Sequence, residues 1–133
     1  MDYPYSMTIK VRSYDLDSFG HVNNAVYLNY LEAARCEYMQ QRGLSFNDFK
    51  KWGALPIVGK TEIRYKSPAR ADDILEIRGT IHSWRRSSFG IDYQIHNSTT
   101  DKLCATARMV FAFVDEYGKL TRVPEVFKEK MKD

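Results

Sequence analysis

Residues 14–35 read YDLDSFGHVNNAVYLNYLEAAR, and this stretch decides the fold. It joins an acid-rich turn directly to the one long helical pattern of the sequence. From residue 25 to about residue 42, apolar side chains recur at three- and four-residue steps, which predicts an amphipathic helix. We expect Asn23 or Asn24 to cap its start, and Gly43 to end it in the position usual for a left-handed C-terminal cap.

One strand pattern precedes this helix and four follow it. In each, apolar and polar residues alternate with a period of two, which is typical of a half-buried strand. The five segments are residues 7–13, 57–66, 75–82, 89–96 and 103–113. In the second, the apolar face is expected to carry Ile57, Gly59, Thr61, Ile63 and Tyr65. Because the opposite faces are largely polar, we expect an antiparallel sheet with helix on one side only.

Two shorter helices are also expected. One covers residues 45–52 with Ser45 as its cap, and a closing helix starts at Pro124, whose fixed φ suits the first helical position. The resulting fold class is α+β: a strand, a long helix and four antiparallel strands, with the helix lying along the sheet.

Composition limits the classes of protein that fit. A length of 133 residues favours one domain over residues 1–133, and a hydrophobic fraction of 44% with 28% charged residues favours a folded chain. No apolar run reaches the roughly 20 residues of a membrane span, and the start, MDYPYSMTIK, lacks the regions of a signal peptide. We therefore expect a cytoplasmic protein with no membrane partner. The net charge of +3 comes without a nucleic-acid-binding signature, so no nucleic-acid partner is expected.

The turn before the long helix carries the candidate chemistry. Backbone N–H groups at a helix start lack intrahelical acceptors and favour negative charge. A carboxylate beside them suits attack on a polarised carbonyl, because the N–H groups stabilise the oxyanion that forms. Asp15 and Asp17 also fit turn and capping roles, which are the commoner use of an Asp between a strand and a helix. A structural role is expected for Asp15, and from the residues alone both roles stay open for Asp17.

The run DLDSFGHVNNAVYLNYLEAAR resembles acyl-thioester hydrolases of the 4-hydroxybenzoyl-CoA thioesterase type, including bacterial acyl-CoA thioesterases. Its HVNN run also looks like that of plant acyl-carrier-protein thioesterases. The segments GLSFNDFKKWG, DDILEIRG and WRRSSF sit where the family has counterparts. The resemblance implies the hotdog fold, in which a curved antiparallel β-sheet wraps around one long central α-helix. It also implies hydrolysis of an acyl-CoA to free acid and CoA, no cofactor beyond the CoA of the substrate, and a homodimer or homotetramer.

The resemblance assigns roles to single residues. The second acid of the motif, Asp17, is the implied catalytic carboxylate, acting as nucleophile or as general base. The N–H that polarises the thioester carbonyl falls at or next to Asn24. The plant enzymes imply a functional imidazole at His21, which is expected to orient a neighbour or to contact substrate rather than to act as general base; a half-buried structural histidine fits nearly as well. A second branch of the fold carries its acid within the long helix, which makes Glu32 the fallback, although an ion pair with Arg35 is its expected role.

A second cluster, WRRSSF, lies between two of the strands. Arg85, Arg86 and Ser88 are predicted to bind the phosphates of coenzyme A, and an ordinary basic turn fits the same residues equally well. Lys60, Arg64 and Lys66 are expected on a solvated face or at a subunit contact.

No metal site is expected, because Asp15, Asp17 and His21 make a weak ligand set with nothing cooperating elsewhere. Two alternatives stay open beside the acyl-CoA thioesterase. One is an acyl-carrier-protein thioesterase, and the other is a non-catalytic acyl-CoA-binding module.

Overall fold

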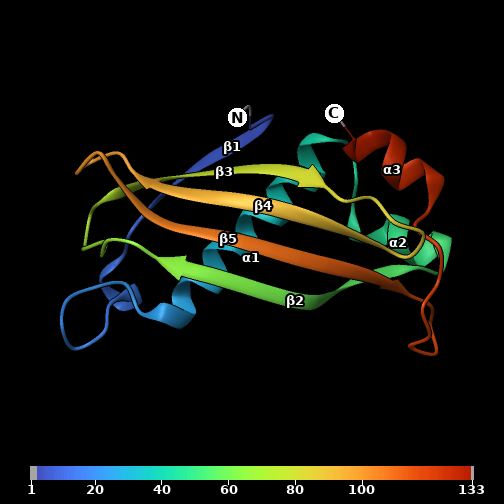
Figure 1. The fold of residues 1–133 in the computed structure, drawn as a ribbon, viewed down its shortest axis with the longest axis horizontal. Helices are drawn as coiled ribbons and strands as arrows, with labels where there is room; N and C mark the ends of the chain where they lie inside the picture. Colours follow the sequence, from blue (N-terminus) through green and yellow to red (C-terminus); the bar gives the residue numbers. More distant parts are fainter. Residues whose placement is uncertain (1–2, 133) are drawn as a thin grey trace.

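The computed structural model describes residues 3–132, which form a five-stranded antiparallel sheet with one long helix along it (Figure 1). In chain order the elements are β1 (Tyr5–Lys10), a 3-10 turn (Ser13–Asp15), α1 (Asn24–Gln41), α2 (Phe46–Trp52), β2 (Leu55–Tyr65), β3 (Ile74–His82), β4 (Ser88–Asn97), β5 (Lys102–Val114) and α3 (Glu125–Met131). The strand order is β1-β3-β4-β5-β2, so β1 and β2 are the edges. The predicted α+β hotdog fold is confirmed.

The long helix α1 lies as its apolar pattern predicts. Its buried residues are Tyr27, Tyr30, Leu31, Ala34 and Tyr38. Asn23 is the N-cap, because its Oδ1 accepts the Ala25 N–H at 2.9 Å. Gly43 follows the last turn with a φ of 75°. Leu28, which the apolar spacing places in the stripe with Leu31, is 43% exposed because it faces an open groove beside β2.

The core fills the space between α1 and the inner face of the sheet. Fully buried side chains from the central strands include Leu75, Ile77, Ile91, Ile95 and Phe111. Burial of each such side chain contributes about 1.5–3 kcal/mol. Within residues 3–132, no helix is both long and apolar enough to span a membrane.

Two predicted boundaries are wrong by a few residues. The first strand was expected over residues 7–13, but β1 ends at Lys10. The carboxylate of Asp15 accepts the Arg12 N–H at 3.0 Å and draws the chain into the 3-10 turn. Pro124 is the N-cap of α3 rather than its first residue.

The face assignment in β2 is wrong before residue 59. A β-bulge between Val58 and Lys60 shifts the register against β5. As a result Val58 lies opposite the buried Phe111 on the inner face, while Ile57 lies opposite Ala112 on the outer face. A bulge adds one residue to a strand and so reverses the face of everything before it. Thr61, after the bulge, is on the inner face as predicted.

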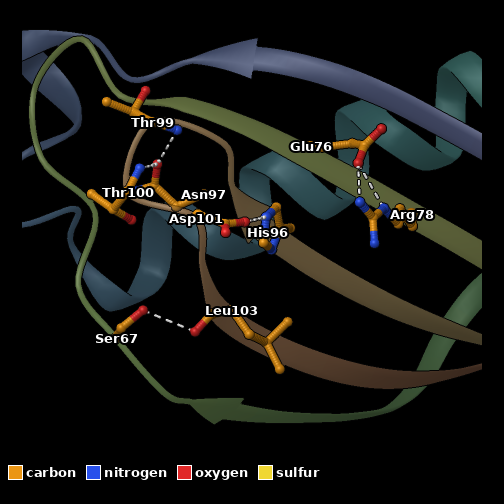
Figure 2. A network of polar contacts seen from close by, with 9 residues as sticks. All are labelled: Ser67, Glu76, Arg78, His96, Asn97, Thr99, Thr100, Asp101 and Leu103. Carbon is orange, nitrogen blue, oxygen red and sulfur yellow. Dashed lines mark hydrogen bonds and ion pairs between the residues drawn. The ribbon is translucent and has the colours of Figure 1, made fainter.

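Polar contacts fix the loops at one end of the sheet (Figure 2). Asn97 accepts the Thr99 N–H at 3.0 Å through Oδ1. Its amide donates to the buried carboxylate of Asp73 at 2.8 Å. Ser67, just after β2, donates its hydroxyl to the Leu103 carbonyl at 2.8 Å. These bonds hold in place the segment that follows β2, which lies against the start of α1.

Candidate active site

Asp17 lies in the turn between β1 and α1, and one of its two carboxylate oxygens accepts hydrogen bonds from the backbone of that turn. Its Oδ1 accepts the N–H groups of Phe19 at 2.9 Å and His21 at 3.3 Å. Gly20 has a φ of 77°, which the turn requires and which glycine adopts without strain. The other oxygen, Oδ2, has no hydrogen-bond partner within the described chain. The carboxylate therefore keeps one acceptor for a ligand.

A cavity of about 250 Å³ opens at the N-terminus of α1. The lining includes Asp17, His21, Asn24, Tyr27, Tyr65 and Lys66. The structure thus brings the three residues named from the motif, Asp17, His21 and Asn24, to one cavity. Tyr65, at the end of β2, and Lys66, which follows it, also line the cavity, and the sequence motif did not predict this.

Asn24, which lines this cavity, has a free backbone N–H. As the first residue of α1 it has no intrahelical acceptor. Asn23 accepts the next two N–H groups, that of Ala25 through its side chain and that of Val26 through its carbonyl at 2.9 Å. Among residues 3–132, no acceptor bonds to the Asn24 N–H. This donor is therefore available to an oxygen of a bound ligand.

Asp15 has the structural role that was expected. It is buried and accepts the hydroxyl hydrogen of Tyr30 at 2.7 Å, and its carbonyl accepts the Asn23 N–H at 2.9 Å. Burial and the Asp15 carboxylate raise the pKa of Tyr30, so the phenol stays a donor. Asp15 and Asp17 thus face different partners. Across the described residues, no group of three or more His, Cys, Asp or Glu side chains is arranged to hold a metal ion.

His21 is half-buried at the cavity wall. Its Nε2 lies 3.4 Å from Nη2 of Arg70. Because Arg can only donate, Nε2 is the acceptor if the two side chains form a hydrogen bond. Val22, the next residue, donates its N–H to the Ala69 carbonyl at 2.9 Å, which keeps the two segments together. The contact with Arg70 fits the orienting role expected for His21.

Two tyrosines close the side of the cavity toward β2. Tyr65 donates its hydroxyl to the Asn24 carbonyl at 3.1 Å. The ring of Tyr27 packs edge-on against Tyr65, with centroids 5.4 Å apart. Burial raises the pKa of Tyr27 to about 12, so its phenol stays neutral at physiological pH. Lys66, expected on a solvated face, is exposed and also lines the cavity.

Comparison with known proteins places this arrangement in a family. A sequence model described as the thioesterase-like superfamily matches residues 11–131. The chain belongs to this superfamily. The predicted thioesterase family is therefore confirmed.

Three similar proteins illustrate the range of this superfamily. The long-chain acyl-CoA thioesterase FadM of Escherichia coli is 32% identical over 111 residues, covering 80% of each chain. The acyl-acyl carrier protein thioesterase ATL3 of Arabidopsis thaliana is 25% identical over 95% of this chain, which spans only 66% of that relative. A solved thioesterase from Thermus thermophilus, complexed with coenzyme A and Zn, is 26% identical with a TM-score of 0.84, covering 99% of this chain and 100% of that one.

Glu32, the fallback acid, lies outside the cavity of Asp17. Glu32 accepts from Arg35 at 2.7 Å, which confirms the predicted ion pair three residues apart on α1. The pair lines the groove between α1 and β2 instead.

The predicted phosphate-binding cluster lies at the other end of the sheet from Asp17 (Figure 1). Arg85 and Arg86 line a cavity of about 370 Å³ together with Arg122 and Lys128. Within residues 3–132, no carboxylate forms an ion pair with any of these four cations. Ser88 is not part of this lining, and its carbonyl accepts the Arg85 N–H at 2.9 Å. At about 3.3 Å per residue, the ten residues of β4 separate the two ends by roughly 30 Å.

Proposed function

We propose that this protein is an acyl-CoA thioesterase with Asp17 as its catalytic carboxylate and the Asn24 N–H as its oxyanion donor. The observation that carries the proposal is that Asp17, which has an unpaired carboxylate oxygen, and Asn24, which has an unpaired helix N-terminal N–H, line the same cavity. The acyl-CoA thioesterase named among the relatives supports the choice of substrate.

The chemistry needs no group beyond these residues and water. A thioester carbonyl oxygen accepts from the Asn24 N–H, which stabilises the charge that develops there; removal of one such donor typically costs about 3 kcal/mol. As general base, Asp17 takes a proton from water while the water oxygen bonds to the carbonyl carbon. As nucleophile, it forms a mixed anhydride that water then hydrolyses. In both routes the C–S bond breaks, the thiolate of CoA takes a proton, and no cofactor takes part.

The proposal is tested by release of free thiol from short, medium, long and aromatic acyl-CoA substrates. We expect turnover of at least one class, with kcat well above the rate without enzyme. A non-catalytic acyl-CoA-binding module would be stabilised against heat by the same compounds without releasing thiol. That result would contradict the proposed function.

An acyl-carrier-protein thioesterase is the second candidate, and the plant relatives favour it. The same acyl group should be offered on CoA and on acyl carrier protein at equal concentration. A higher kcat/KM for the CoA ester supports the first proposal, and a higher value for the carrier protein supports the second. The cytoplasmic location stays a prediction.

We further propose that two copies pair through β2. This strand is an edge of 11 residues whose exposed apolar side chains include Leu55, Ile57, Val58 and Tyr65. A long exposed edge strand offers unpaired N–H and C=O groups to another strand, and a two-fold axis pairs it with its own copy. Sedimentation equilibrium tests this, because the expected species is a dimer or a tetramer built from dimers, and a monomer would contradict it.

Such pairing explains why the phosphate-binding candidates lie far from Asp17. When β2 pairs antiparallel with its copy, the Tyr65 end of one chain lies beside the Leu55 end of the other. The partner's basic cluster then approaches the first chain's Asp17 cavity. Arg85 and Arg86 would thus hold the phosphates of a CoA whose thioester reacts at Asp17 of the other chain.

Mixed dimers test this arrangement. One subunit carries Asp17→Asn and the other carries Arg85→Ala with Arg86→Ala, each with a different affinity tag. We expect each pure variant to have low kcat/KM, and the mixed dimer to recover about half of the wild-type value because one of its two sites is intact. A mixed dimer no more active than the average of the two pure variants would place both functions in one chain and contradict the proposal.

A further inference from the structure

The Asp17 side chain lies on a small hairpin formed by residues 15–23. The Asp17 N–H donates to the His21 carbonyl at 2.8 Å. Next to this pair, the Asn23 N–H donates to the Asp15 carbonyl at 2.9 Å, and an antiparallel bridge lies between the two bonds. The hairpin therefore holds its own two arms together, and it ends at Asn23, the N-cap of α1.

The orientation of this hairpin relative to α1 needs a further constraint. Asn23 has a φ of −62° and a ψ of 139°, which is extended backbone, so the regular helix does not continue into the hairpin. Asp17 and the Asn24 N–H lie on opposite sides of this point, and a displacement of about 1 Å at a reacting group can cost roughly 10²-fold in rate. The second arm is tied to the segment after β2, because the Val22 N–H donates to the Ala69 carbonyl at 2.9 Å. The first arm, which carries Asp17, needs an anchor of its own.

A buried hydrogen bond joins this first arm directly to α1. The carboxylate of Asp15 accepts the hydroxyl hydrogen of Tyr30 at 2.7 Å and the Arg12 N–H at 3.0 Å, both through Oδ2. Asp15 is 9% exposed and Tyr30 is 4% exposed, so little water competes for the bond. Burial and the Asp15 carboxylate raise the pKa of Tyr30, which keeps the phenol a donor.

We propose that Asp15 and Tyr30 are positioning residues, whose hydrogen bond fixes the Asp17 carboxylate relative to the Asn24 N–H. This inference rests on the proposed function. The lining of the Asp17 cavity includes neither Asp15 nor Tyr30, so the pair acts through the two groups that it aligns and not on the substrate. The bond requires an acceptor oxygen at Asp15, whereas the reaction requires a charged carboxylate at Asp17.

Tyr30→Phe tests the proposal, and Tyr5→Phe is its matched control. Tyr5 is buried on β1 and also donates its hydroxyl to a carboxylate of α1, that of Glu37 at 3.3 Å. Glu37 lies about 20 Å along α1 from Asn24, at roughly 1.5 Å per residue. Both variants therefore remove a phenol hydroxyl that donates to a carboxylate, but only Tyr30→Phe does so beside the Asp17 hairpin.

Thiol release from the best acyl-CoA substrate gives kcat and KM for each variant. We expect Tyr30→Phe to lower kcat about tenfold to 100-fold, because Asp17 and the Asn24 N–H are both present but less well aligned. KM should stay within about twofold of the wild-type value, since no substrate contact is removed. Tyr5→Phe should leave kcat within about twofold of wild type, even where its melting temperature falls as far as that of Tyr30→Phe.

Two substitutions of Asp15 separate the acceptor from its charge. Asp15→Asn keeps an oxygen that can accept from Tyr30 and from the Arg12 N–H, so kcat should stay within about threefold of wild type. Asp15→Ala removes the acceptor and should lower kcat as far as Tyr30→Phe does. At Asp17 the charge itself is required, so the same change to Asn has the opposite outcome.

Amide hydrogen exchange, followed by NMR, provides a measurement that does not depend on turnover. The groups to follow are the N–H groups of Asp17 and Asn23, whose bonds hold the hairpin together. In Tyr30→Phe both should exchange severalfold faster than in wild type, because local opening governs the exchange rate. In Tyr5→Phe both should exchange at the wild-type rate.

Wild-type kcat in Tyr30→Phe or in Asp15→Ala would overturn the inference. An equal loss of kcat in Tyr30→Phe and Tyr5→Phe would also overturn it, since the effect would then be a general loss of stability. Failure of the proposed function reads out separately, as absence of thiol release from every acyl-CoA by the wild-type protein. Amide exchange then still decides whether the bond fixes the hairpin, because wild-type exchange rates in Tyr30→Phe contradict that role and faster rates support it.

Discussion

Replacement of Asp17 by Asn is expected to lower kcat for thioester hydrolysis by about 10³-fold while leaving the fold intact, since a carboxylate acting in proton transfer typically contributes 10²–10⁴-fold. Asn keeps an Oδ1 that accepts the N–H groups of Phe19 and His21, so the turn retains its bonds. It replaces the unpaired, charged Oδ2 by an uncharged amide group. Thiol release under saturating substrate measures kcat, and a thermal melt checks that the melting temperature stays within a few degrees of wild type.

The chain supplies a matched control for this substitution. Asp115 closes a turn of the same kind: its Oδ1 accepts the N–H of Tyr117 at 2.9 Å and of Lys119 at 3.0 Å, and Gly118 follows with a φ of 79°. Asp115→Asn should therefore change neither kcat nor stability. Wild-type turnover by Asp17→Asn would show that Asp17, like Asp115, is only a turn residue, and the proposed mechanism would be wrong.

Periodicity predicted the elements because it depends on local geometry alone. An α-helix returns a side chain to the same face every three or four residues, and a strand every two, so α1 and the five strands could be located from their own residues. Caps are equally local, since Asn23 and Gly43 act on backbone groups within a few residues. The hotdog fold itself was predicted from the resemblance carried by residues 15–35.

Strand register and tertiary contacts could not be predicted from periodicity. The bulge at Val58 depends on how β2 meets β5, and nothing in the β2 sequence specifies it. The hydrogen bond from the Tyr30 hydroxyl to the Asp15 carboxylate was not predicted, because the two residues are 15 positions apart in sequence. Both cases involve a partner that is distant in sequence, and a periodic pattern contains no information about that partner.

The residues of the candidate site also fall into those that are close in sequence and those that the fold brings together. Asp17, His21 and Asn24 lie within one short segment, so a motif could name them together. Tyr65 and Arg70 reach the site only because β2 ends beside the start of α1. A sequence signal for them would have required knowledge of which strand lies next to the helix.

The second large effect is expected at the opposite end of the sheet, where Phe127→Ala should lower the free energy of unfolding by about 3–5 kcal/mol. Phe127 is fully buried, and its ring centroid lies 5.1 Å from those of Phe89 and Phe113 and 5.9 Å from that of Phe49. The neighbouring rings come from β4, β5 and α2, so the cavity left behind cannot close by moving one element. Urea unfolding followed by circular dichroism measures the change.

The position of Phe127 explains why α3 depends on it. A helix of seven residues is not stable by itself, so packing of its buried side chains must hold α3 on the sheet. Val126→Ala is the control, because Val126 is 49% exposed on the same helix and its truncation should cost less than about 0.5 kcal/mol. Since the Val123 N–H donates to the Arg86 carbonyl at 2.8 Å, loosening α3 also loosens the basic loop. Phe127→Ala should therefore raise KM for acyl-CoA more than it lowers kcat. An equal loss of unfolding free energy in Phe127→Ala and Val126→Ala would show that α3 is not anchored by this ring.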